Sequence, residues 1–117
     1  MYRSFYIFRV PKQKVAEFLR INQEAGEIYR RYGALESEIM RAADIAPKYG
    51  CLGLGDTVQA SDDEVVFIGI DGFRDQAHCR EIMPKIDADP RINELFAEIQ
   101  KVVDLSTVVR GEFESVA

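Results

Sequence analysis

Apolar side chains recur with two different periods along this chain, and the two periods separate predicted strands from predicted helices. Residues 4–10 are apolar and aromatic and end at Pro11, as in a short strand. Residues 34–42 alternate apolar and polar positions, and residues 64–73 form a longer apolar run, so we expect strands there as well. A last strand is predicted from Thr107 to Phe113.

Two regions between these strands show helical spacing. Over residues 12–32, apolar side chains recur at intervals of about three or four positions, which predicts an amphipathic helix. Asp75 is placed to cap a second helix that runs into Pro84, where we expect a kink or an early break. The pair Asp89-Pro90 predicts a restart as a third helix, because Asp is a favoured N-cap and Pro a favoured first helical residue.

The least regular part of the chain lies between the second and third strands. This segment, Ala43–Asp63, is rich in turn residues, and we expect a short strand within it at 56–60. Earlier in the chain, Gly33 supplies the C-terminal stop of the first helix. The glycines of the 43–63 segment spell Gly-x-x-Gly-x-Gly over residues 50–55, which is not the dinucleotide-binding fingerprint. The run neither follows a clear strand nor opens a helix, so we do not expect a phosphate cradle.

The predicted order of elements is β-α-β-β-α-β, with the second helical region split in two. This order matches the ferredoxin-like motif, an α+β sandwich in which a four-stranded antiparallel sheet carries its helices on one face. No low-complexity tract or linker divides the sequence. We therefore expect residues 1–117 to form a single ferredoxin-like domain.

The third strand is apolar on both faces, although the helices suffice to cover only one. One face carries Val66, Ile68 and Ile70, and the other carries Val65, Phe67 and Phe73. Leaving the second set in water forfeits roughly 1.5–3 kcal/mol per side chain, and a continuous patch of this kind is rare on a monomer. We therefore expect a two-fold homodimer with its sheets face to face, a dimeric α/β barrel. The alternative is that strand edges or the 43–63 loop fold over the sheet.

Composition narrows the classes of partner. Twenty acids against fifteen bases give a net charge of −5, and the basic residues are scattered, so we expect no nucleic-acid partner. No apolar run is long enough for a signal peptide or a membrane span, which predicts a cytoplasmic protein without a membrane partner. Cys51 and Cys79 are expected to be reduced thiols, and with a single histidine in the chain a metal site is not expected.

Six short runs occur in order along nearly the whole chain. They are Val10-Pro11-Lys12-x-Lys14, Gly33-Ala34-Leu35-Glu36, Glu64-Val65-Val66-Phe67, Ala77-His78, Ala88-Asp89-Pro90-Arg91 and Gly111-x-Phe113-Glu114. Together they resemble the YbaA-like proteins, a bacterial family of unknown function in the dimeric α/β-barrel superfamily. The resemblance implies a ferredoxin-like protomer and a homodimer, and it brings no established reaction with it.

His78 is the only side chain whose unperturbed pKa lies near neutral pH. It falls in the first turn of the helix that Asp75 is expected to cap, where the helix dipole favours a neutral imidazole. Such a ring could act as a general base or as a hydrogen-bond donor. The structural alternative is a helix-start histidine bonded to a nearby carbonyl or carboxylate.

Acidic residues on the predicted strands are the other candidates for chemistry. Glu36 and Glu38 are two positions apart and so share one face of their strand, as do Arg110, Glu112 and Glu114 on the last strand. If these faces line a barrel interior, carboxylates lie beside an arginine in a semi-enclosed site where pKa values can be tuned. Asp71, on the face of its strand that carries Phe67 and Phe73, could join them. The structural alternative is solvent-facing charges or ion pairs between two copies.

Three functions remain open from the sequence. The first is a homodimeric module that binds a small organic molecule in its cleft, with Tyr6, Arg110 and Glu112 as candidate ligand contacts. The second is a cofactor-independent enzyme, monooxygenase-like or isomerase-like, in which His78, Glu36, Glu38 or Asp71 transfers a proton. The third is a structural protein with a filled barrel. No cofactor is expected, and haem chemistry is disfavoured because the chain has one histidine and no tryptophan.

Overall fold

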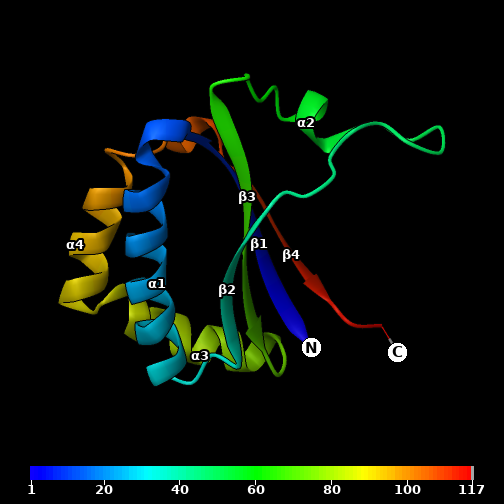
Figure 1. Cartoon of the computed structure of the whole chain (residues 1–117). Helices are drawn as coiled ribbons and strands as arrows, with labels where there is room; N and C mark the ends of the chain where they lie inside the picture. The colour runs from blue at the N-terminus through cyan, green and yellow to red at the C-terminus, as the bar shows by residue number, and fades with distance from the viewer. Residues whose placement is uncertain (117) are drawn as a thin grey trace.

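The computed structural model describes residues 1–116 and confirms the ferredoxin-like order of elements. An antiparallel sheet with the spatial order β2-β3-β1-β4 is formed by β1 (Tyr2–Pro11), β2 (Glu36–Arg41), β3 (Glu64–Phe73) and β4 (Val109–Glu114). The helices are α1 (Val15–Arg31), α2 (Leu54–Thr57), α3 (Gln76–Asp87) and α4 (Pro90–Ile99), and short 3-10 turns lie at Lys12–Lys14 and Leu105–Thr107. Figure 1 shows α1, α3 and α4 on one side of the sheet, so the molecule has two layers.

The register of the sheet decides which side chains face the helices. The central strand β1 sets Phe8 opposite Phe67 and Val10 opposite Val65, and both pairs point toward α1 and join one hydrophobic core. Phe67 is 2% exposed and Phe73 is 1% exposed. The expectation that Val65, Phe67 and Phe73 would form the uncovered face is therefore wrong, because these positions alternate onto the helix side.

The uncovered face of the sheet is the other one. It carries Ile68 and Ile70 of β3, with Ile7 and Phe5 opposite them on β1. Val66 lies on the same face opposite Arg9, but it is 6% exposed and so is already covered within the chain. Figure 1 shows no helix of the α1, α3 and α4 layer on this side. We call this surface the open face. An apolar uncovered face was predicted, but the residues that form it are not the ones that were expected.

Helix α1 ends where its backbone turns into a left-handed conformation. Gly33 has φ +116°, which side chains with a Cβ rarely adopt. The Gly33 N–H bonds the Arg30 carbonyl at 3.0 Å, and the Ala34 N–H bonds the Tyr29 carbonyl at 3.1 Å. These bonds satisfy carbonyls of the last turn, so the predicted glycine stop is confirmed.

The caps predicted for α3 and α4 are also confirmed. The Asp75 carboxylate accepts from the His78 N–H at 2.8 Å, and Asp89 accepts from the backbone of α4 while Pro90 takes the first helical position. The early break expected at Pro84 is wrong, since α3 continues to Asp87, whereas a kink there stays a prediction. Proline removes one intrahelical hydrogen bond, and the buried side chains of Ile82 and Ile86 keep the helix on the sheet on either side of it.

The segment between β2 and β3 extends away from the sheet and returns through α2 (Figure 1). The short strand predicted at 56–60 is wrong: Leu54–Thr57 form a single helical turn, held by the Gly55 N–H on the Ile45 carbonyl. Arg9 donates to the carbonyls of Val58 and Gln59, which attaches the returning part of the segment to one end of the open face. The tip projects, with the side chain of Tyr49 97% exposed.

No helix within residues 1–116 combines the length and the apolar character needed to cross a lipid bilayer.

Candidate functional site

A cleft of about 660 Å³ lies between the sheet and the helices. Its sheet wall is made by β1, β2, β3 and β4, and its outer walls by α1, α3 and α4. The apolar lining includes Tyr6, Phe8, Ile39, Leu95, Phe96 and Val108. The polar groups that reach it include Tyr29, Ser37, Asp71, Asp87 and Arg110. The helix layer therefore does not fill all the space above the sheet.

Two glycines bring the walls of the cleft into position. Gly26 on α1 faces β2, and a Cβ there would lie 3.4 Å from both the carbonyl oxygen and the hydroxyl oxygen of Ser37. A Cβ at that distance would be in ordinary van der Waals contact, so α1 packs directly on β2 at this position. Gly69 on β3 faces the cleft between Tyr6 and Ile39, and it contributes no side chain to the cleft floor. Helix α1 therefore packs closely on β2, and the cleft extends over β1 and β4.

Asp71 is the central polar group of the cleft. It lies on the same face of β3 as Phe67 and Phe73, as predicted. One carboxylate oxygen accepts from the Ser37 hydroxyl at 2.7 Å. Burial raises the pKa of Asp71, and the negative charge of Glu36 raises it further, while hydrogen bonds from the Ser37 and Ser4 hydroxyls act in the opposite direction. The result is a desolvated carboxyl group at the cleft, the kind of group that binds or moves a proton.

Tyr29 reaches the same cleft from α1, the opposite wall. Burial raises the pKa of the Tyr29 hydroxyl, and the negative charge of Asp71 adds to the effect. The phenol therefore stays protonated at neutral pH.

The three candidate ligand contacts lie together at the edge formed by β1 and β4. The Arg110 guanidinium lies 5.4 Å from the centroid of the Tyr6 ring and donates to the Glu112 carboxylate. The Tyr2 hydroxyl also donates to Glu112, and these two hydrogen bonds lower the pKa of that carboxyl group. Tyr6 and Arg110 line the cleft, whereas Glu112 serves mainly as the partner that neutralises Arg110.

His78 lies apart from the residues that line the cleft. Its side chain is buried, and its Nδ1 accepts the backbone N–H of Arg74 at 3.1 Å, so in the neutral ring the proton sits on Nε2. The ring contacts Phe73 edge to face with the centroids 6.0 Å apart. The ring therefore holds the turn before α3 through a backbone N–H, and not through the carbonyl or carboxylate that the structural alternative expected. Its catalytic role stays a prediction.

Glu36 and Glu38 share one face of β2 as predicted, but it is the open face. Glu36 forms an ion pair with Arg3, and Glu38 is exposed at the margin of the cleft. The carboxylates expected to converge are therefore divided, with Asp71 on the helix side of the sheet. The proton-transfer roles of Glu36 and Glu38 stay predictions.

Ser37 and Tyr29 were not predicted from the sequence as members of the site. Ser37 stands between Glu36 and Glu38, and the alternation that puts those two on one face puts Ser37 on the other. The strand period therefore contained the signal for Ser37. Tyr29 lies on the apolar stripe of α1, where an aromatic residue is more often core, so nothing in its spacing distinguishes it.

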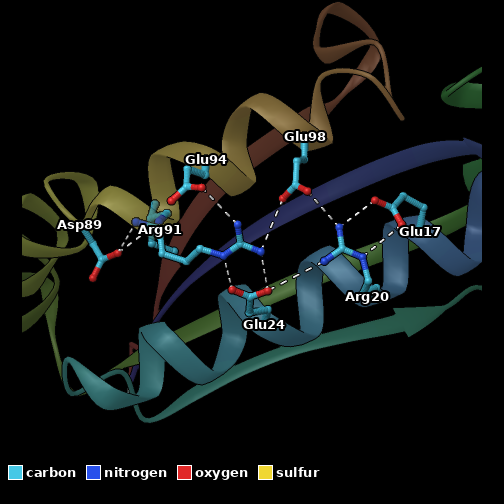
Figure 2. Close-up of polar contacts among 8 residues, drawn as sticks. Glu17, Arg20, Glu24, Asp89, Arg91, Glu94 and Glu98 are labelled. Atoms are coloured by element: carbon cyan, nitrogen blue, oxygen red, sulfur yellow. Dashed lines mark hydrogen bonds and ion pairs between the residues drawn. The ribbon is translucent and has the colours of Figure 1, made fainter.

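Charged residues fasten α4, the outer wall of the cleft, to α1. Figure 2 shows two arginines that cross between the helices. Arg91 donates to Glu24 with its Nη2 2.8 Å from Oε1, and Arg20 donates to Glu98 at 3.2 Å. Single exposed ion pairs contribute about 0–1 kcal/mol, so position is their main effect. On the inner side of the same helix, the Leu95 side chain is 2% exposed.

Within the described part of the chain, no group of three or more histidine, cysteine, aspartate or glutamate side chains is arranged to hold a metal ion.

The sequence matches a family model described as "Protein of unknown function (DUF1428)" over residues 1–103. No functionally curated protein matches it. The match supports the expectation of a family of unknown function, whereas the YbaA-like name stays a prediction.

Solved structures with the same fold cover the whole chain. An uncharacterized NIPSNAP domain protein from Burkholderia xenovorans is 16% identical, with a TM-score of 0.63 over 100% of this chain and 96% of its own. A candidate antibiotic biosynthesis monooxygenase from Nitrosomonas europaea is 10% identical, with a TM-score of 0.68 over 100% of both chains. A protein described as an antibiotic biosynthesis monooxygenase is 13% identical, with a TM-score of 0.64 over 100% of both chains. At these identities the likeness shows the fold alone.

The raised pKa of Asp71 gives a testable dependence of stability on pH. The folded protein holds this proton more tightly than the unfolded chain, so the stability gained is fully present below the ordinary pKa of 3.8 and is lost as the pH rises through the folded value. The side chain of Asp71→Asn does not titrate, so this variant does not lose that stability as the pH rises. We expect the melting temperature of Asp71→Asn, relative to the wild type, to increase from pH 4 to pH 8 in thermal melts. The exposed variant Asp62→Asn should show no such trend, and parallel curves for Asp71→Asn would contradict the assignment.

Proposed function

Because the chain belongs to DUF1428, a family of proteins of unknown function, we propose from its own cleft that it binds a small, largely apolar organic molecule between the sheet and the helices. The volume of about 660 Å³ is the observation that carries the proposal. It falls in the range of about 300–1,000 Å³ that is typical of small-molecule sites. Such sites combine mainly apolar walls with a few convergent polar groups, as this one does.

The lining favours a planar ring over a flexible polar ligand. Tyr6, Phe8 and Phe96 supply aromatic surface from two walls, and aliphatic side chains from α1 and α4 supply most of the rest. Asp71 and Tyr29 are the polar groups that would orient such a ring, because both are held by packed elements. The monooxygenase-like and NIPSNAP neighbours support this only as analogies between folds.

We further propose that two copies associate through the open face. Phe5, Ile7, Ile68 and Ile70 form its centre, and at its edges Val109 is 50% exposed and Phe113 is 64% exposed. A second copy presents the same apolar surface, so a two-fold arrangement would cover both at once. The projecting segment between β2 and α2 carries Tyr49 and Leu52, which are available to contact the partner.

A second candidate function is acid–base catalysis at the same cleft. The observation that favours it is the desolvated carboxyl of Asp71, whose pKa is raised toward the range where it both takes up and releases a proton. In such a reaction a C–H bond of the substrate breaks, its proton moves to the Asp71 carboxylate, and the electron pair stays on the substrate as an enolate. No external oxidant is needed for this step.

Filling the cleft should abolish binding of an apolar probe. The probe is N-phenyl-1-naphthylamine, whose fluorescence rises in apolar surroundings. It is titrated against the wild type and against Ala25→Leu, a variant that places a larger side chain in the cleft wall. We expect Ala25→Leu to bind roughly tenfold more weakly, equivalent to about 1.4 kcal/mol. Ala16→Leu, the same change on the exposed side of α1, should bind as the wild type does. A folded Ala25→Leu protein with unchanged affinity would contradict the proposal.

Sedimentation velocity tests the homodimer. We expect the wild type to sediment as a dimer at micromolar concentration and Val109→Glu to sediment as a monomer, because the new carboxylate would be buried in the interface without a partner. Leu19→Glu, on the helix side and 41% exposed, is the matched control and should remain dimeric. A wild-type chain that is a stable monomer at this concentration would refute the proposed association.

Deuterium exchange tests the catalytic alternative. The α hydrogens of 2-tetralone exchange slowly in D2O, and we expect the protein to accelerate the exchange, which is followed by proton NMR. Asp71→Asn should return the rate to that of buffer, and Asp62→Asn should not change it. If folded His78→Ala abolishes the acceleration while Asp71→Asn keeps it, the proton-transfer group is His78 and the assignment to Asp71 is wrong.

A further inference from the structure

The charges around the cleft do not balance. Two aspartates, Asp71 and Asp87, line it, and among its described lining residues Arg110 is the only cation. Arg110 is already paired, because Glu112 accepts from its guanidinium and lies beside it on β4. The cleft therefore presents more negative than positive charge to a ligand.

Asp71 is the residue where this imbalance matters most. Its hydrogen-bond donors are neutral: the Ser37 hydroxyl lies 2.7 Å away, and the Ser4 hydroxyl acts on it from the paired position of β1. Within residues 1–116 no lysine, arginine or histidine forms an ion pair with Asp71. Buried carboxylates are normally paired with a cation or strongly hydrogen-bonded, because removing the charge from water is costly. A carboxylate that faces a cleft without such a partner is placed to receive one from a ligand.

We infer that the ligand of the cleft is an apolar ring compound that carries a protonated amine, with its ammonium group donating to the Asp71 carboxylate. This inference rests on the proposed binding function and adds the ligand's chemical class. The ring would lie against Tyr6 and Phe8, which form the aromatic part of the sheet wall. The ammonium would supply the missing counter-charge through a charge-assisted hydrogen bond.

Other polar groups on the same ring fit less well. A neutral alcohol can donate one hydrogen bond to Asp71, but it leaves the buried charge without a counter-charge. A carboxylate would be repelled by both Asp71 and Asp87, and the guanidinium that could attract it is engaged by Glu112. The expected order of affinity is therefore amine, alcohol, acid.

Three naphthalene compounds test this order by isothermal titration calorimetry at pH 7. They are 1-naphthylmethylamine, 1-naphthalenemethanol and 1-naphthaleneacetate, which differ chiefly in the polar group. We expect the amine to bind roughly tenfold more tightly than the alcohol or better, the difference typical of a hydrogen bond to a charged group. The acid should bind most weakly.

Asp71→Asn separates the charge of this residue from its shape. The amide keeps an oxygen that can accept from Ser37, and it carries no negative charge. We expect the amine to fall to the affinity of the alcohol in this variant, while the alcohol changes by less than about twofold. Asp62→Asn makes the same change in net charge at an exposed turn and should keep the preference for the amine.

The outcomes distinguish this inference from the proposed function. If amine and alcohol bind the wild type equally, the inference is wrong while binding in the cleft stands. If the preference for the amine persists in Asp71→Asn, the ammonium binds elsewhere and the inference is again wrong. If none of the three compounds binds and N-phenyl-1-naphthylamine does not bind either, both proposals fall.

Discussion

The contact of one aromatic side chain on α1 with two on the sheet sets the position of the helix layer. Phe18 is fully buried, and its ring centroid lies 5.0 Å from that of Phe8 and 5.0 Å from that of Phe67. These contacts hold the first half of α1 over β1 and β3, and Gly26 in its second half packs against Ser37 of β2. Because α1 is fixed there, and α4 packs beside it, the space over β1 and β4 is left unfilled. The cleft follows from this packing.

The same packing explains why an acid lies where the core would otherwise continue. Along the helix-facing side of β3, the order is Val65, Phe67, Gly69 and Asp71, so side-chain volume falls just where α1 comes closest to β2. Asp71 is desolvated by these neighbours and yet faces the cleft. An ionisable group at such a place costs stability and is retained more readily for function than for packing.

Much of the fold could be predicted from the sequence, because it depends on local signals. Period-two and helical spacing gave the order of elements, and Asp75, Asp89 and Gly33 marked helix ends by hydrogen bonds that each residue makes locally. The side of the sheet covered by helices could not be predicted, because Val65 and Val66 sit on equally apolar faces of β3. Only the connection of α1 to β1 decides between them.

The candidate site was less predictable, for a related reason. Asp71 stood out as an acid inside an apolar strand, but its neighbours Ser37 and Tyr29 come from β2 and α1, which are distant in sequence.

The two faces of β3 serve different purposes. Ile68 and Ile70 point away from the cleft, and Gly69 and Asp71 point into it, so one strand bears both the surface available for association and the floor of the cleft. Alternation along a strand keeps these two surfaces chemically independent, because a substitution on one face leaves the side chains of the other in place.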